Sequence, residues 1–107
     1  MRPLHRSAIV IKPKRLFIKW ANSVSGDGTE FIADYFIENH SCVVLMPEHN
    51  YKSQKVFSFI NGVWESIFEE SLRDWNLDTT QWPPQRTQKM FKQWFSVEFH
   101  LAVFDTK

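Results

Sequence analysis

The sequence has a single cysteine and only three glycines among its 107 residues. One thiol cannot form an internal disulfide, which excludes a secreted, disulfide-stapled domain. Cys42 begins the apolar run Cys42-Val43-Val44-Leu45-Met46, so we expect it to be a small buried hydrophobe and not a nucleophile. The scarcity of glycine also leaves no glycine-rich loop in which a phosphate could approach the backbone.

Long apolar runs are absent as well. Near the N-terminus the first continuous apolar stretch is Ala8 to Ile11, which is much too short for the core of a signal peptide or for a membrane span. We therefore expect a cytoplasmic location and no membrane partner.

Sequence motifs for metal binding and for nucleophilic catalysis are missing. The four histidines are scattered, and no HxxxH, CxxC or HExxH spacing occurs. There is no Gly-x-Ser-x-Gly elbow, no Walker loop and no dinucleotide fingerprint. We predict no metal and no cofactor.

Aromatic residues, in contrast, are abundant: they make up 16% of the chain and include ten Phe and five Trp. Each can bury on the order of 150 to 250 Å², so a chain of this length can form a core without disulfides or a metal. We predict a single domain over residues 1–107.

The spacing of apolar residues predicts seven elements in the order β-α-α-β-α-α-β. Strands are expected over residues 7–12, 41–46 and 97–103. Helices are expected from Pro13, placed at the first helical position, to about 24, and then over 30–38, 53–75 and 87–95; a strand is the alternative for 30–38. With right-handed crossovers, these elements give an α/β or α+β fold with a small sheet of about three to four strands layered by helices. Five consecutive apolar residues place the strand 41–46 at the centre of that sheet.

Charge is distributed unevenly, although the formal net charge is only +1. The basic residues Lys12, Lys14, Arg15 and Lys19 surround the start of the first predicted helix. A helix N-terminus attracts anions, so these residues are candidates for a phosphate or carboxylate site. The alternative is a solvated helix face, which the missing amide of Pro13 favours.

A second candidate is Glu98 with His100, two residues apart on one face of the last strand. If that face were covered, the two groups could serve as acid and base; if it is half exposed, they form an ordinary ion pair, which is the interpretation we favour. Trp82 is expected to fill the core, and Arg86 to pin its loop through a carboxylate such as Glu98 or Asp78.

The C-terminal part of the chain resembles a family of small uncharacterised bacterial proteins. The pattern is Trp75-x2-Asp78-x3-Trp82-Pro83-x2-Arg86-Thr87-x3-Phe91-x2-Trp94-Phe95-x2-Glu98-x-His100-x2-Val103-x-Asp105. The segments Val44–Glu48 and Lys12–Lys14 extend the resemblance over most of the chain. It implies no activity.

Three functional hypotheses follow. The first is a protein-interaction or oligomerisation module, forming a homodimer or binding a protein partner, because the aromatic surplus can exceed what one small core buries. The second is an anion or nucleic-acid binder acting through the basic N-terminal segment. The third and least favoured is an enzyme that uses Glu98 and His100.

Overall fold

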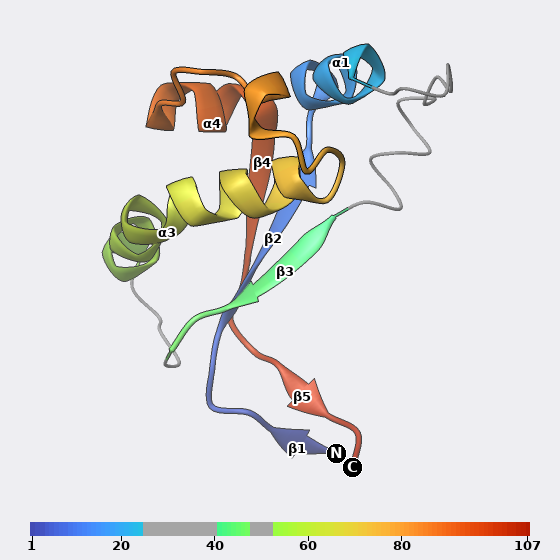
Figure 1. The fold of residues 1–107 in the computed structure, drawn as a ribbon. Helices are drawn as coiled ribbons and strands as arrows, with labels where there is room; N and C mark the ends of the chain where they lie inside the picture. Colours follow the sequence, from blue (N-terminus) through green and yellow to red (C-terminus); the bar gives the residue numbers. More distant parts are fainter. Residues whose placement is uncertain (25–40, 48–52) are drawn as a thin grey trace.

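The structure is a computed structural model that describes residues 1–24, 41–47 and 53–107. It has an α+β fold, as expected (Figure 1). The helical elements are α1 (Arg15–Ser23), α3 (Ser53–Arg73), the short 3-10 turn η1 (Thr79–Gln81) and α4 (Gln88–Trp94). The strands are β1 (Arg2–Pro3), β2 (Ala8–Pro13), β3 (Cys42–Leu45), β4 (Phe95–His100) and β5 (Phe104–Asp105). The helix predicted over 30–38 lies outside the described residues.

The larger sheet has the strand order β3-β2-β4, and both pairings are antiparallel. The expected right-handed crossovers between parallel strands are therefore wrong. The strand predicted over 41–46 lies at an edge of this sheet and not at its centre; β2 is the central strand. The burial of β2 fits this position, since Ile9 and Ile11 are 0% and 1% exposed.

Alternation along the strands gives the sheet two different faces. The register places Ile9 between Val44 and Phe99, and Ile11 between Cys42 and Val97. Because side chains alternate along a strand, these residues share one face, which we call the core face. Ile9 and Ile11 belong to the hydrophobic core together with residues of α1, α3 and α4.

The helices are held to the core face by an aromatic cluster. Phe68 of α3 is 0% exposed, and its ring lies 5.4 Å from Trp94 and 5.3 Å from Phe95. Phe17 of α1 lies 5.1 Å from Phe95 and so joins the first helix to the same cluster. These tilted and edge-on contacts are the arrangements that aromatic pairs prefer. The aromatic surplus of the sequence is thus used in part to join three helices at one end of the sheet.

The helix starts follow local chemistry. Thr87 accepts a hydrogen bond from the Met90 amide and caps α4, so the helix begins one residue later than predicted. Pro13 is the last residue of β2 and not the first residue of a helix, because the strand continues through its pairing with Phe95. Lys14 is the N-cap of α1, and its amide donates to the Trp94 carbonyl at 2.7 Å.

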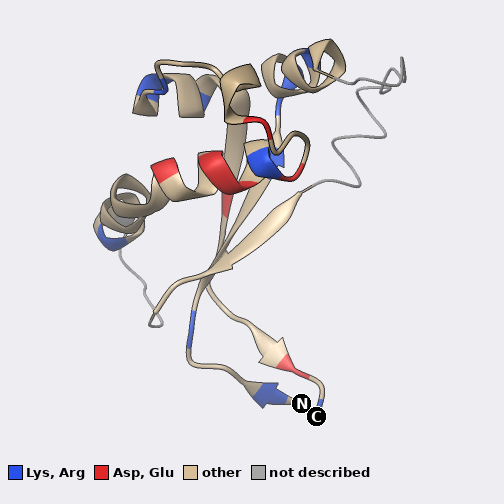
Figure 2. Cartoon of the chain, in the orientation of Figure 1, with Lys and Arg blue, Asp and Glu red and all other residues tan. Residues whose placement is uncertain are grey.

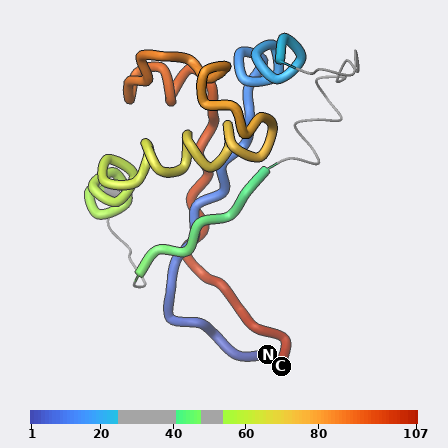
Figure 3. The backbone as a smooth tube through the Cα atoms, viewed as in Figure 1, coloured from blue at the N-terminus to red at the C-terminus, as the bar shows by residue number. Residues whose placement is uncertain are grey.

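A narrow ribbon extends from the sheet. The strands β1 and β5 pair as a small antiparallel sheet near both termini, and β1-β2 runs beside β4-β5 (Figure 3). Between the two paired regions lie residues 4–7 on one side but only 101–103 on the other. The extra residue marks a β-bulge, and His5, with φ of 51°, has the left-handed backbone that such a bulge uses. The ribbon was not predicted.

The loop after α3 is fixed by Trp82 and Arg86. Trp82 is 7% exposed, which confirms that it fills the core, and its indole N–H donates to the Asn76 carbonyl at 2.8 Å. Arg86 stacks over the Trp82 ring and donates to the Glu69 carboxylate at 3.0 Å. Arg86 therefore pins its loop, but through Glu69 and not through Glu98 or Asp78.

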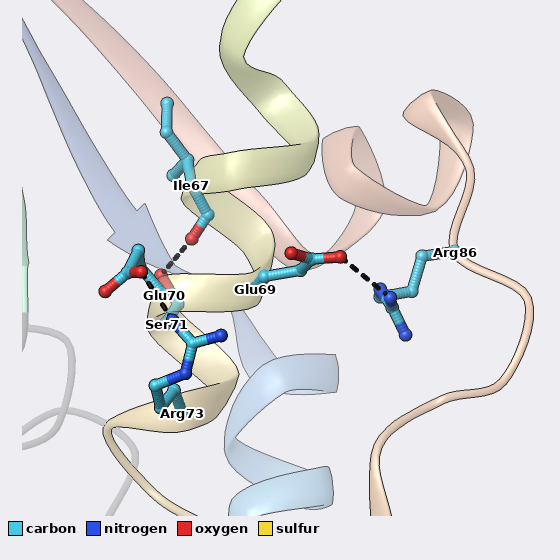
Figure 4. A network of polar contacts seen from close by, with 6 residues as sticks. All are labelled: Ile67, Glu69, Glu70, Ser71, Arg73 and Arg86. Carbon is cyan, nitrogen blue, oxygen red and sulfur yellow. Dashed lines mark hydrogen bonds and ion pairs between the residues drawn. The ribbon is translucent and has the colours of Figure 1, made fainter. Parts of the chain in front are cut away.

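Figure 4 shows that two neighbouring carboxylates of α3 pair with different arginines. Because Glu69 is engaged by Arg86, Arg73 pairs with Glu70. An ion pair between Glu69 and Arg73, expected from their i,i+4 spacing, is not the one formed. Between these two residues, the Ser71 hydroxyl donates to the Ile67 carbonyl one turn back at 2.9 Å.

Candidate functional site

The face of the sheet opposite the core face is the first candidate surface, which we call the open face. Within the described residues no helix packs on it (Figure 1). The register gives its side chains as Ala8, Val10, Lys12, Val43, Leu45, Ser96, Glu98 and His100. Val43 is 62% exposed and Leu45 is 36% exposed, although the sequence pattern predicts both to be buried. The open face is thus apolar along β3 and polar along β4.

The polar part of the open face is a row of three side chains. The ammonium of Lys12 lies 3.0 Å from Glu98 Oε1, and His100 Nε2 lies 3.6 Å from Glu98 Oε2. The contact with Lys12, followed by that with His100, lowers the pKa of the Glu98 carboxyl. Lys12 comes from the central strand and the other two from β4, so the antiparallel register brings the row together.

The structure therefore joins one predicted anion-site residue to the predicted acid and base. All three side chains are between about 38% and 53% exposed, so water screens their interactions. Neither Glu98 nor His100 lines either of the cavities described below. This geometry matches the half-exposed ion pair that we favoured over a covered acid and base.

The outer edge of β4 is the second notable feature. β4 is the last strand of its sheet, so the side facing away from β2 has no strand partner within the described residues. We call this side the β4 edge. Along it the exposure of the core-face side chains rises from 4% at Phe95 to 41% at Phe99, and Leu101 just beyond the strand is 36% exposed. Among the described residues, the helices cover the beginning of β4 but not its end.

The remaining basic residues lie at the start of α1. A shallow hollow of about 460 Å³ is lined by Lys12, Lys14 and Arg15 together with Gln93 and Ser96. Lys19 is exposed but does not line the hollow. The Lys14 ammonium donates to the Lys92 carbonyl at the end of α4, which occupies one of its donors.

The electrostatics of this region favour anions. The first turn of α1 contains no acidic residue, and the side chain of its N-cap, Lys14, does not cap the helix. Most acidic side chains of the described residues lie on α3 and the turn that follows it, and others lie on β4 and β5 (Figure 2).

A larger cavity of about 520 Å³ lies between α3 and the core face. Its walls include Ile11, Val44 and Ile67, and Asp74 and Cys42 lie at its polar side. Cys42 is exposed, so its predicted full burial is wrong. Partial burial, followed by the nearby Asp74 carboxylate, raises the pKa of the thiol, which makes it a poor nucleophile at neutral pH.

The described part of the chain shows no group of three or more His, Cys, Asp or Glu side chains placed to hold a metal ion. Among its helices, none combines the length and apolar character needed to cross a bilayer.

No protein-family model, no curated protein and no solved structure matches this chain. The resemblance to a bacterial family therefore stays a prediction. The structure nevertheless explains most residues of the quoted pattern without a ligand: Asp78 caps η1, Trp82 and Phe91 are buried, and Thr87 caps α4. Glu98 and His100 are the members of that pattern that lie exposed on the open face.

Sequence reasoning missed the apolar part of this surface. Val43 and Leu45 were expected to be buried because they belong to the apolar run 42–46. A short β-branched run has the same appearance whether one or both of its faces are covered, so the strand 42–45 carried no signal of its exposure.

Proposed function

We propose that this protein is a protein-interaction module that self-associates through the uncovered part of its sheet. The observation that supports the proposal is the exposure of apolar side chains where no described helix covers the sheet: Val43, Leu45, Phe99 and Leu101 are 62%, 36%, 41% and 36% exposed. Scattered exposed apolar residues are normal on protein surfaces, but here Val43 and Leu45 lie on one edge strand of the sheet, and Phe99 and Leu101 lie at the end of the other.

The proposal includes the cytoplasmic location expected from the sequence and the suggested bacterial family. It does not use the cavity beneath α3 or any cofactor. Catalysis by Glu98 and His100 is the least supported alternative, because both groups are about half exposed.

Sedimentation velocity over a wide range of protein concentration tests the proposal. Wild-type protein should shift from monomer towards dimer as concentration rises. Leu101→Lys should weaken that shift, because it places a charge on the uncovered apolar surface. Leu77→Lys is the matched control, since Leu77 is 81% exposed in the loop after α3. A wild-type protein that stays monomeric up to its solubility limit contradicts the proposal.

A second candidate function is binding of a polyanion at the start of α1. The specific observation is the hollow lined by Lys12, Lys14 and Arg15 in front of a helix start that has no acidic residue. Fluorescence anisotropy of a labelled oligonucleotide should then show binding that weakens steeply with salt and is reduced in Arg15→Gln. Binding that is absent at low salt, or equal in wild type and variant, removes this candidate.

A further inference from the structure

We infer that two copies of this chain pair along the β4 edge in antiparallel orientation, with Phe99 facing Phe99 of the second copy. This inference rests on the proposed self-association and specifies its interface. The pairing would join three strands from each copy into one continuous sheet, in the order β3-β2-β4 followed by β4-β2-β3. Addition of a strand to an open sheet edge is a recurrent mode of protein recognition.

The first argument is that the β4 edge lacks the features that usually protect an edge strand. Such strands are commonly shortened, bulged or interrupted by Pro or Lys. β4 has six residues, Phe-Ser-Val-Glu-Phe-His, with no Pro, Gly or Lys among them. The bulge at His5 lies on the opposite strand of the ribbon, and the other edge strand, β3, has only four residues and is followed closely by Pro47. Of the two edges, β4 is therefore the one open to pairing.

The second argument is that the sequence around Phe99 is complementary to its own reverse. In an antiparallel pair centred on Phe99, Glu98 faces His100 of the second copy, and His100 faces its Glu98. Beyond the end of β4, the same pairing would place Val97 opposite Leu101 and Ser96 opposite Ala102 if the strand extended past the bend at Leu101. Apolar residues thus meet apolar residues and the acid meets the base, which are the cross-strand pairs that stabilise sheets. A two-fold axis makes each of these contacts twice.

The third argument is that two apolar side chains at the end of β4 remain exposed to solvent in a single copy. Phe99 and Leu101 are 41% and 36% exposed where none of the described helices covers them. Pairing across the axis would cover each with an apolar side chain of the second copy.

Glu98 also has room for a second partner. Its Oε1 is 3.0 Å from Lys12, whereas the 3.6 Å between its Oε2 and His100 of the same chain is too long for a hydrogen bond. That oxygen can accept a hydrogen bond from His100 of the second copy, while the bond to Lys12 is kept.

Disulfide trapping tests this register. In a Cys42→Ser background, Phe99→Cys places one thiol on the two-fold axis, and opposed residues of an antiparallel pair have Cα atoms about 4.5 to 5.5 Å apart, within disulfide range. Mild oxidation should yield a covalent dimer. Val97→Cys in the same background is the control: it should not cross-link to itself, because the two copies of position 97 would be displaced from each other by four residues, or about 13 Å, along the paired strands.

A second experiment exchanges the charges at positions 98 and 100. His100→Glu places two carboxylates opposite each other twice and should weaken dimerisation by at least several-fold. The double variant Glu98→His/His100→Glu restores complementarity and should recover part of the loss. A dimer in sedimentation that neither cross-links through position 99 nor responds to His100→Glu overturns this register but leaves the proposed function standing. A monomer under all conditions overturns both.

Discussion

The two faces of the central sheet differ, although they are built from the same three strands. On the core face Ile9, Ile11 and Phe95 are 0%, 1% and 4% exposed, whereas on the open face Val43 is 62% exposed beside a row of charged groups. The two faces differ because the aromatic side chains of α1, α3 and α4 pack on only one face, at one end of the sheet. Among the described residues, the helices therefore stabilise one side of the sheet, and the other side and the end of β4 are the surfaces that the proposed self-association would use.

The largest effect is expected from a mutation in the aromatic cluster that packs on the core face. Phe68→Ala removes a fully buried ring that contacts Phe91, Trp94 and Phe95, and should lower the free energy of unfolding by about 3 to 5 kcal/mol. Phe57→Ala on the same helix removes a ring that is 65% exposed and should change it by under about 0.5 kcal/mol. Urea unfolding of both variants measures the difference, and equal losses would contradict the assigned core.

A smaller effect compares the two faces directly. Ile11→Ala on the core face should cost about 2 to 5 kcal/mol, because it leaves a cavity under α3. Val43→Ala, in the neighbouring strand but on the open face, should cost under about 0.5 kcal/mol in the monomer. Denaturation at low protein concentration keeps self-association out of the comparison. A costly Val43→Ala there would mean that the open face is covered within one chain.

A helix cap on the covered side should give a still smaller change. Thr87→Ala removes the side-chain acceptor for the Met90 amide and should cost about 1 kcal/mol, whereas Thr87→Ser should restore most of the stability. Thermal unfolding of the pair is the measurement. If Ser does not rescue, the hydroxyl of Thr87 is not the capping group.

The smallest effect concerns the ion pair on the open face. Lys12 holds the pKa of Glu98 below its usual range, so the carboxylate contributes stability at pH values above the ordinary range of a Glu side chain. That contribution is lost as the pH falls through the lowered folded-state pKa. The difference in stability between wild type and Glu98→Gln should therefore be small at neutral pH and vanish in acid. A difference that grows as the pH falls contradicts the assigned pair.

Much of the fold could be predicted from local patterns. The helices containing Phe17, Phe68 and Phe91 were recognised because apolar residues recur at helical spacing over several turns. Trp82 was placed correctly for a similar reason, since a loop aromatic depends on near neighbours, whereas Thr87 was expected inside the helix and is its cap. Apart from β1, η1 and β5, which were not predicted, the order of elements agrees with the structure over the described residues.

What could not be predicted depends on long-range pairing. The central position of β2, the antiparallel register and the ribbon of β1 with β5 are set by contacts between residues some 30 to 100 positions apart. The contact of Lys12 with Glu98 is of this kind, so the sequence indicated each residue but not the row they form. The partner of Arg86 was missed likewise, because Glu69 becomes a neighbour only when the loop folds back on α3.

Amide hydrogen exchange at two protein concentrations tests the central claim most directly. If the β4 edge pairs with a second copy, amides of residues 97–101 that point away from β2 should exchange more slowly at high concentration than at low concentration, while exchange along β3 stays unchanged. Exchange along β4 that is independent of concentration, in a sample shown to contain dimers, would contradict pairing along this edge.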